Sequence, residues 1–441
     1  MTKIDDLLKD IKVEWKTLGE VAKDKFWIMP STPKYISGEE IRYITSKNIR
    51  NGTINFNNSK YISNNDYIEI SKNREIMCND ILISMIGTLG EIAIVKEEDL
   101  PFYGQNMYLL RLDMDLINIR YFYHFFNSKI IKTYLQSIKN NSSQGYLKQK
   151  HIDNIKIPIP PIEIQKEIAK TLDKFTEYVT KLTVELTTEL TTRKKQYSYY
   201  RDLLLSEEYL NRISSKLMLE EDQSNEVIQT TLGEIGKFIR GNGLQKKDFT
   251  KDGKPVIHYG QIYTSYGFST AKTISYTSVE TFSKLKKAKP GDIVMATTSE
   301  NVEDVCKSVV WLGNEEIGIS GDCYIFSTDQ NAKYLAYFFQ TIAFQVQKER
   351  KVTGTKVIRV NAKDMEKFKV FLPPIHIQQN VVEILDKFQE YMNDINGLFP
   401  EEIEQRKKQY EYYREKLLTF HEEYDKHTHT HTHTHTHTHN T

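Results

Sequence analysis

The sequence predicts a mixed α/β chain built as an internal pseudo-twofold repeat: two α/β domains separated by two long helices that pack as an antiparallel coiled coil. Three observations lead to this fold class. The 441 residues exceed one ordinary domain. Residues 160–205 and 373–418 align without a gap, 213 positions apart, and nearly half of the aligned residues are identical. Weaker similarities precede both segments, so the whole unit is repeated rather than the helix alone.

The repeated segments are expected to be helices. Apolar residues recur at alternating steps of three and four from Ile164 to Leu204 and from Ile377 to Leu417, as in a coiled-coil seam. Two prolines open each segment, where proline is tolerated. We expect the second helix to break near Gly397 and Pro400, because an interior proline removes a hydrogen bond. Two separate amphipathic helices, each covering its own domain, remain an alternative.

The sequence patterns before the helices predict mixed α/β structure. Residues 80–85 and 292–296 are short apolar runs after a turn and predict buried strands. Residues 121–135 and 334–346 are rich in aromatic residues at helical spacing, which favours a core role over stacking on bases. Upstream matches such as residues 17–20 with 231–234 agree with a second domain. We divide the chain into an N-terminal amphipathic segment (1–14), a first domain (15–158), a central helix (159–206), a linker (207–228), a second domain (229–371), a distal helix (372–420) and a disordered His/Thr tail (421–441).

Composition excludes several classes of protein. The net charge of +1 means that any nucleic-acid surface must come from local clustering of cations. Three cysteines, Cys78, Cys306 and Cys323, predict neither a disulfide framework nor a zinc site. The N-terminus is charged throughout and no apolar run approaches the roughly 20 residues of a membrane span. We expect a cytoplasmic protein with no membrane partner.

Two variable domains alternating with two similar helices resemble the specificity subunits of type I restriction–modification enzymes. Each helix opens with Pro-Pro-Ile-x-Ile-Gln and closes with Arg-Lys-Lys-Gln-Tyr-x-Tyr-Tyr-Arg. The first also carries the tandem tetrapeptides Thr183–Leu186 and Thr187–Leu190, and the similarity covers about residues 13–420. The resemblance implies target-recognition domains that each read one half of a bipartite, asymmetric double-stranded DNA site. It also implies two methyltransferase subunits and motor-nuclease restriction subunits as partners, which would bind S-adenosylmethionine, ATP and Mg, with no cofactor on this chain.

Helix length sets an upper limit on the distance between half-sites. About 44 residues at 1.5 Å each span roughly 66 Å, on the order of two turns of DNA. One more tetrapeptide would lengthen the helix by ~6 Å and turn it slightly more than once, so the apolar stripe would nearly be preserved.

Candidate DNA-binding residues are polar and basic side chains in two loops at matching points of the repeat. In the first copy they are Asn141, Ser142, Ser143, Gln144, Gly145 and Lys148; in the second they are Lys351, Thr353, Gly354, Thr355, Lys356 and Arg359. A solvated surface turn is the alternative. Secondary candidates, for which the alternative without DNA contact is favoured, are Lys47, Asn48, Arg50, Lys246, Lys247, His258 and Gln261.

A basic run recurs in both helices and is a candidate for subunit docking, with phosphate contact or a solvated face as alternatives. Its residues, with the tyrosine that follows, are Arg193, Lys194, Lys195 and Tyr197, and Arg406, Lys407, Lys408 and Tyr410. No catalytic constellation stands out, so we expect no enzymatic activity, no catalytic residue and no metal site. The His/Thr tail is low-complexity and could reflect a slippage-prone gene repeat. The rival interpretation is a coiled-coil scaffold that joins proteins without reading DNA.

Overall fold

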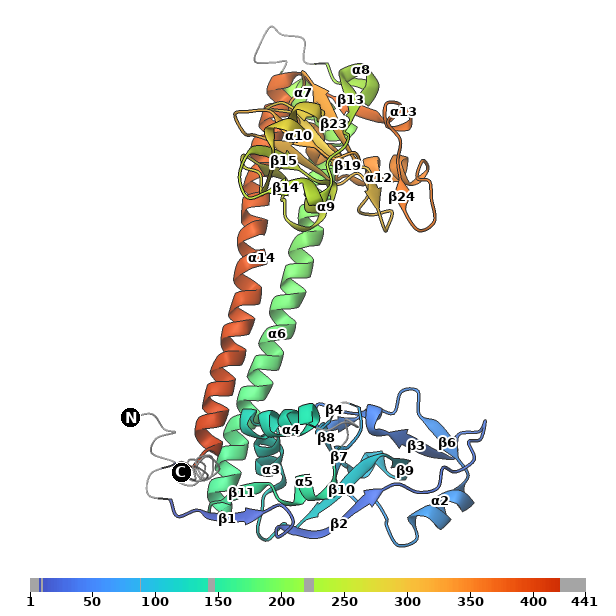
Figure 1. The fold of residues 1–441 in the computed structure, drawn as a ribbon, viewed down its shortest axis with the longest axis vertical. Coiled ribbons are helices and arrows are strands. Elements are labelled where there is room, and N and C mark those ends of the chain that lie inside the picture. The colour runs from blue at the N-terminus through green and yellow to red at the C-terminus, as the bar shows by residue number, and fades with distance from the viewer. Residues whose placement is uncertain (1–7, 9–10, 88, 142–146, 218–225, 421–441) are drawn as a thin grey trace, which may run out of the picture. The chain divides into compact units, whose positions relative to one another are not determined.

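The computed structural model describes residues 8, 11–87, 89–141, 147–217 and 226–420 (Figure 1). Contacts divide the chain into two compact units, each of which combines one α/β domain with part of both long helices. Unit 1 is Met1–Glu185 with Glu401–Thr441, and unit 2 is Leu186–Pro400. The predicted tail 421–441 and most of the N-terminal segment 1–14 lie outside the described residues.

Unit 1 is built on an antiparallel four-stranded sheet and a smaller mixed sheet. The four-stranded sheet has the order β2 (Ala22–Ile28), β10 (Met107–Leu112), β7 (Ile81–Ser84), β8 (Ile92–Ile94). The mixed sheet has the order β6 (Lys60–Ile62), β3 (Ile41–Thr45), β9 (Phe102–Gln105), with β3 and β9 parallel. Two further strand pairs are β1 (Glu14–Thr17) with β11 (Lys156–Ile159) and β4 (Ile49–Arg50) with β5 (Thr53–Ile54). The helices before the long ones are α2 (Asn64–Ser71), α3 (Ile119–Phe126), α4 (Lys129–Asn141) and α5 (Gln149–Asp153). Two short 3-10 helices are η1 (Ser46–Asn48) and η2 (Glu97–Asp99).

Unit 2 repeats this plan with added edge strands. One sheet has the order β13 (Gly236–Arg240), β23 (Cys323–Thr328), β19 (Ile293–Ala296), β21 (Ser308–Trp311), β16 (Ser269–Thr270). The other has the order β14 (Phe249–Thr250), β17 (Ser275–Thr277), β15 (Lys254–Ile257), β22 (Ile317–Ile319), β18 (Lys287–Ala288). Two further strand pairs are β12 (Ile228–Thr231) with β25 (Lys369–Leu372) and β20 (Thr298–Ser299) with β24 (Ile358–Arg359). The helical elements are α7 (Glu207–Leu217), α8 (Leu232–Ile235), η3 (Lys246–Asp248), α9 (Tyr259–Thr264), α10 (Val279–Lys284), α11 (Ala332–Phe338), α12 (Ile342–Glu349) and α13 (Ala362–Met365).

The two predicted strands are confirmed as β7 and β19, in the same position of the two sheets. All four residues of each strand are buried, as continuous apolar runs require. Asn79 (φ 68°) and Gly291 (φ 91°) make the preceding turn in the left-handed conformation that Asn and Gly tolerate best. The carboxylates of Asp80 and Asp292 then accept backbone N–H bonds at 2.7 Å, from Met77 and Lys289. The Asp at this point of both copies therefore shapes a turn.

The aromatic segments are helical and form cores, as predicted, but each is split into two helices. In unit 1, α3 ends before Ser128 and α4 begins at Lys129; in unit 2, Thr341 caps α12 after α11 ends. Tyr121, Phe122, Phe125 and Phe126 are all buried in the core of unit 1. The aromatic content of these segments therefore serves packing.

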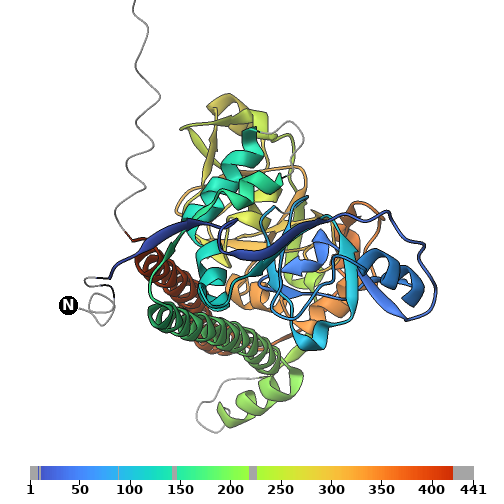
Figure 2. The same cartoon turned by 90° about the horizontal axis from the view of Figure 1, so that it is seen from below.

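The long helices α6 (Ile162–Leu204) and α14 (Ile375–Leu418) pack on one another within each unit. In unit 1 the start of α6 lies beside the end of α14 (Figure 2), and Phe175 stacks on Tyr413 with ring centroids 5.5 Å apart. In unit 2 the end of α6 meets the start of α14, where Tyr200 stacks on Phe388 at 5.9 Å. Start meets end in both units, so the predicted antiparallel packing is confirmed within each.

The predicted break near residues 397–400 is wrong, because α14 is continuous and contains Pro400. A proline removes one backbone hydrogen bond and crowds the preceding turn. Here Asn396, Gly397 and Pro400 are exposed, while Met392 and Ile395 are buried one to two turns before the proline. Packing on one side of the helix holds it together where the sequence rule predicts an end.

The predicted linker 207–228 contains a helix. Residues Glu207–Leu217 form α7, and Leu210 is fully buried in the core of unit 2. The first half of this segment is therefore part of the packed domain.

Candidate nucleic-acid interface

In unit 1 a short polar segment follows β3 and contains the candidates Lys47 and Arg50. Asn48 fixes its shape: its Oδ1 accepts from the Thr45 amide at 3.0 Å and its Nδ2 donates to the Asn55 carbonyl at 2.7 Å. The β4–β5 hairpin turns through Asn51 and Gly52, both at positive φ, which is the turn chemistry that Asn-Gly favours. Backbone and Asn48 thus hold the segment, and the Lys47 and Arg50 side chains are left exposed.

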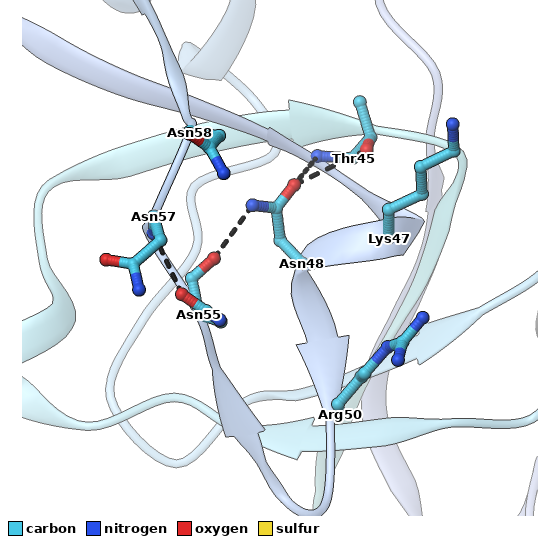
Figure 3. Close-up of a pocket in the computed structure, with 7 residues that line it drawn as sticks. All are labelled: Thr45, Lys47, Asn48, Arg50, Asn55, Asn57 and Asn58. Carbon is cyan, nitrogen blue, oxygen red and sulfur yellow. Dashed lines mark hydrogen bonds between the residues drawn. The ribbon is translucent and has the colours of Figure 1, made fainter. Parts of the chain in front are cut away.

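This segment lines a shallow hollow of about 380 Å³ (Figure 3). Its seven lining residues are Thr45, Lys47, Asn48, Arg50, Asn55, Asn57 and Asn58. None of them is acidic, and two are cations. Within the residues that the structure describes, no carboxylate lies within ion-pair distance of Lys47 or Arg50. The hollow is therefore a small, locally positive surface on a chain of nearly zero net charge.

The side chains around the hollow match the chemistry of duplex DNA. Arg pairs with the O6 and N7 of guanine, Asn pairs with the N6 and N7 of adenine, and Lys neutralises phosphate. Asn57 donates its backbone N–H to the Asn55 side chain at 2.9 Å (Figure 3), and its own side-chain amide lies in the lining of the hollow. Asn48 is different, because both ends of its amide are already bonded. Asn48 therefore positions the segment, whereas Arg50, Asn57 and Asn58 line the hollow with side chains of the types that can contact bases.

Unit 2 places a polar segment at the equivalent point, after β15. Gln261 on α9 takes the place of Asn48: its Oε1 accepts from the His258 amide at 3.0 Å and its Nε2 donates to Ser275 Oγ at 2.6 Å. Gln261, a predicted DNA contact, is thus tied into the domain at both ends of its amide. His258 Nδ1 accepts from the Gly260 amide at 3.2 Å, and burial lowers the pKa of His258, with the nearby Lys246 charge acting in the same direction. His258 and Gln261 shape the turn, while Lys246 and Lys247 are exposed beside it.

The later loop of unit 2 is a closed hairpin. Thr353 and Arg359 exchange two backbone hydrogen bonds of 2.9 Å, and β24 pairs with β20. Gly354 has φ 97°, and a Cβ there would lie 2.0 Å from the Val357 carbonyl, so only glycine fits. Thr355 and Lys356 are exposed at the tip, whereas Lys351 lies 4.0 Å from Asp364.

In the first copy, Ser142, Ser143, Gln144 and Gly145 lie outside the described residues, and of Asn141 only its place at the end of α4 is described. Lys148 is exposed at the start of α5, directly after Leu147, whose amide bonds the Met85 carbonyl at 3.0 Å. In both copies, then, the loop returns to the end of the same central strand, β7 or β19.

The structure brings the early and late polar segments of unit 2 together. Tyr263 on α9 donates to the Thr298 carbonyl at 2.9 Å, and Thr298 pairs with Arg359 across the β20–β24 ladder. In unit 1 the β4–β5 turn is fixed to the four-stranded sheet, because Gly52 exchanges backbone hydrogen bonds with Ile92 and Ile94 on β8. Segments that are far apart in sequence thus meet at Thr298 in unit 2.

Comparison with known proteins decides the family. The family model described as "Type I restriction modification DNA specificity domain" matches the chain twice, at residues 11–192 and 225–405. The chain belongs to the type I restriction–modification DNA-specificity family. A putative type I restriction enzyme specificity subunit of Haemophilus influenzae is 28% identical over 95% of this chain and 98% of its own length. The EcoR124I/EcoR124II specificity subunit of Escherichia coli is 29% identical over 66% of this chain and 70% of its own.

Solved structures of low identity share the fold. A chain from a structure of the complex assembly and conformational transition of a type I R-M system has a TM-score of 0.69 at 17% identity, covering 93% of this chain and 98% of that one. The HsdS subunit from Thermoanaerobacter tengcongensis has a TM-score of 0.55 at 15% identity, covering 92% and 96%. Among the described residues, no helix is long and apolar enough to cross a membrane.

In the basic run of this specificity chain, both arginines and Lys408 pair with a glutamate one turn earlier, Lys408 with Glu404 at 3.5 Å. Arg193 and Arg406 each bond a glutamate one turn earlier, Glu189 at 2.7 Å and Glu402 at 2.8 Å. Tyr197 and Tyr410 point into the helix pair rather than outward: Tyr197 bonds Gln389 at 2.8 Å, and Tyr410 bonds Thr176 at 3.1 Å. Their recurrence is therefore explained by packing. Exposed side chains remain at Lys194, Lys195, Lys407 and Lys408.

Sequence reasoning missed the junction between each domain and its helices. In unit 1, Asp173 on α6 binds Arg120 and accepts from buried His124 at 2.7 Å. Asp386 holds the equivalent Lys333 and Tyr337, both at 2.7 Å, in unit 2. The signal was present, because all three pairs of positions keep the 213-residue offset. Only the aspartate is identical between copies, so the repeat preserves a junction whose partners have diverged.

Proposed function

We propose that each domain of this specificity chain reads one half of a bipartite, asymmetric double-stranded DNA target. The observation that carries the proposal is the matched placement of polar segments on one shared scaffold. After the parallel strands β3 and β15, unit 1 presents Lys47 and Arg50 and unit 2 presents a turn built on Gln261. The scaffold is the same and the presented residues differ, so the two half-sites are expected to differ.

We propose that the helices set the distance between the half-sites and carry two methyltransferase subunits, with restriction subunits joining for cleavage. α6 is a continuous helix of 43 residues, so each added residue changes its length by about 1.5 Å. In this proposal the chain itself is non-catalytic, works in the cytoplasm where the DNA is, and leaves S-adenosylmethionine, ATP and Mg to its partners.

The test is methylome sequencing of cells with and without this gene. The proposal expects one split, asymmetric motif to lose its methylation when the gene is removed. The coiled-coil scaffold would be favoured instead if every methylated motif were retained in cells without the gene, while the chain from cells with the gene still co-purified with its protein partners.

A further inference from the structure

A lysine side chain is fully buried in unit 2. Lys348 lies in the last turn of α12, and none of its surface is accessible. Its Nζ donates to the backbone carbonyls of Glu303 and Val305, at 2.9 and 3.0 Å. Within the part of the chain that the structure describes, no carboxylate lies within ion-pair distance of this Nζ. A buried amine costs free energy unless its hydrogens are bonded, so the two carbonyls are what compensates for its burial.

Burial lowers the pKa of Lys348, against the opposing effect of the nearby Cys306, Glu349, Glu303 and Asp304. The contact with the two carbonyls does not depend on the charge, because a neutral amine still has two hydrogens to donate. Lys348 is therefore suited to hold backbone in place rather than to attract an anion.

Both carbonyls belong to residues 297–307, which join strand β19 to strand β21 and which we call the central connection. Strand β20 lies within it and pairs with β24, the returning strand of the late hairpin, with Thr298 opposite Arg359. The amine of Lys348 thus ties α12 to the segment on which the end of the hairpin rests.

Lys348 also fixes the start of the same hairpin. Helix α12 ends at Glu349, and the Lys351 amide donates to the Lys348 carbonyl at 2.9 Å. Its backbone therefore anchors the chain that enters the hairpin, and its side chain anchors the connection that pairs with the chain leaving it. The exposed tip residues Thr355 and Lys356 lie between these two anchors.

Unit 1 has an apolar residue at the equivalent position. Leu135 precedes Lys348 by the 213-residue offset of the repeat (348 − 135), and it is 4% exposed. It packs under the corresponding connection, because a Cβ at Gly90 would lie 2.4 Å from its Cδ1. That connection runs over residues 85–91 and has seven residues, against eleven in the central connection of unit 2.

The difference in length explains the change from leucine to lysine. A longer connection turns additional backbone carbonyls toward the core, where a leucine could not bond them and an amine can. The position under the connection is thus kept in both copies, while its chemistry follows the connection that it supports.

We propose that Lys348 is a positioning residue for DNA readout by unit 2, holding the central connection and the hairpin 351–359 in the arrangement that reads the half-site. This rests on the proposed function. Because Lys348 is fully buried, it acts through the hairpin and does not itself touch DNA.

The experiment uses the full-length chain in complex with the methyltransferase subunits of its own system. The probes are DNA duplexes that carry the split motif methylated in wild-type cells, together with duplexes that differ from it by one base pair in either half. The quantity measured is the ratio of the Kd for each variant duplex to the Kd for the motif. A loss of folded protein alone changes both constants equally and leaves this ratio unaltered.

Lys348→Met keeps much of the length of the side chain and removes its donors. It is expected to lower the discrimination ratio about tenfold at one or more base pairs of one half-site and to leave the other half-site unchanged, since one base pair is worth roughly five- to 150-fold. Lys348→Leu, which introduces the residue that unit 1 has at this position, is the second variant and should act in the same direction.

Two control variants separate positioning from stability. Leu135→Met is the equivalent change in unit 1 and should leave both half-sites unchanged, because it conserves an apolar contact. Leu210→Ala, on α7 in the core of unit 2 but outside the hairpin and the connection, should lower the melting temperature without altering the ratios.

Unchanged ratios in both Lys348 variants would overturn the inference, as would an equal change in both half-sites or the same loss in Leu210→Ala. Hydrogen exchange of the amides of Thr353 and Arg359, which bond one another across the hairpin, is the second readout and should become faster in Lys348→Met than in Leu210→Ala. If the wild-type complex prefers no split motif, the proposed function fails, while the exchange of these two amides still decides whether Lys348 holds the hairpin.

Discussion

Stability of unit 1 should depend on pH through His124. Its ring is fully buried, with Nε2 2.7 Å from Asp173 and Nδ1 3.4 Å from the Tyr410 hydroxyl. Burial lowers the pKa of His124 to about 4; Asp173 acts in the opposite direction, and the Arg120 and Arg414 charges lower it further.

The size of the effect follows from this shift. An unfolded histidine titrates near 6.5, so as pH falls the unfolded chain binds the proton first. Stability contributed by neutral His124 is present above about pH 6.5 and is lost progressively toward pH 4. At pH 4.5 the loss from this one residue is about 2.5 kcal/mol. The pKa of Asp173 is lowered, so that carboxylate stays ionised across this window.

Urea unfolding at pH 7.5 and 4.5 tests this, followed by fluorescence in a Trp311→Phe background. That change leaves Trp15 and Trp27, both in unit 1, as reporters. Between the two pH values the free energy of unfolding should fall by about 2.5 kcal/mol more in the parent than in its His124→Gln variant. An equal fall in both would refute the assignment. Tyr337→Phe, at the equivalent position of unit 2, should not alter the pH dependence.

Three further outcomes are expected. Arg50→Ala should cost about 1–3 kcal/mol of affinity for the cognate site, whereas Lys47→Ala should weaken binding to all sequences and reduce the salt slope by about 0.9; binding measured against salt separates them. One Thr-x-Glu-Leu unit inserted after Leu190 should lengthen the unread spacer of the methylated motif without altering either half, and an unchanged spacer in the methylome contradicts this. Pro400→Ala should raise the free energy of unfolding by up to about 3 kcal/mol and Gly397→Ala by about 1 kcal/mol, since α14 is helical through both positions; a fall in either would contradict a helix that runs through them.

Much of the fold could be predicted because the repeat supplies an internal alignment. Apolar spacing located α6 and α14, and turn residues located β7 and β19, since these depend on local patterns. Pro400 shows the limit: a local rule for proline could not weigh the buried neighbours that keep α14 continuous.

The candidate site could be predicted only in part, because its geometry depends on long-range pairing. Nothing in the sequence indicated that Asn48 would bond Asn55, or that Gln261 would bond Ser275. These hydrogen bonds hold the side-chain amides of Asn48 and Gln261 within their domains. Asn57 and Asn58 were missed because a polar asparagine run resembles any surface loop, and the hollow appears only when β3–β5 has folded.

If each domain reads its own half of the target, changes confined to unit 1 should alter only one half-site. Arg50→Ala combined with Asn57→Ala and Asn58→Ala changes three exposed residues of the unit 1 hollow and none in unit 2. Methylome sequencing of cells carrying this variant should show relaxed or lost specificity in one half of the motif, with the other half and the spacer unchanged. An unaltered motif, or equal change in both halves, would contradict the account.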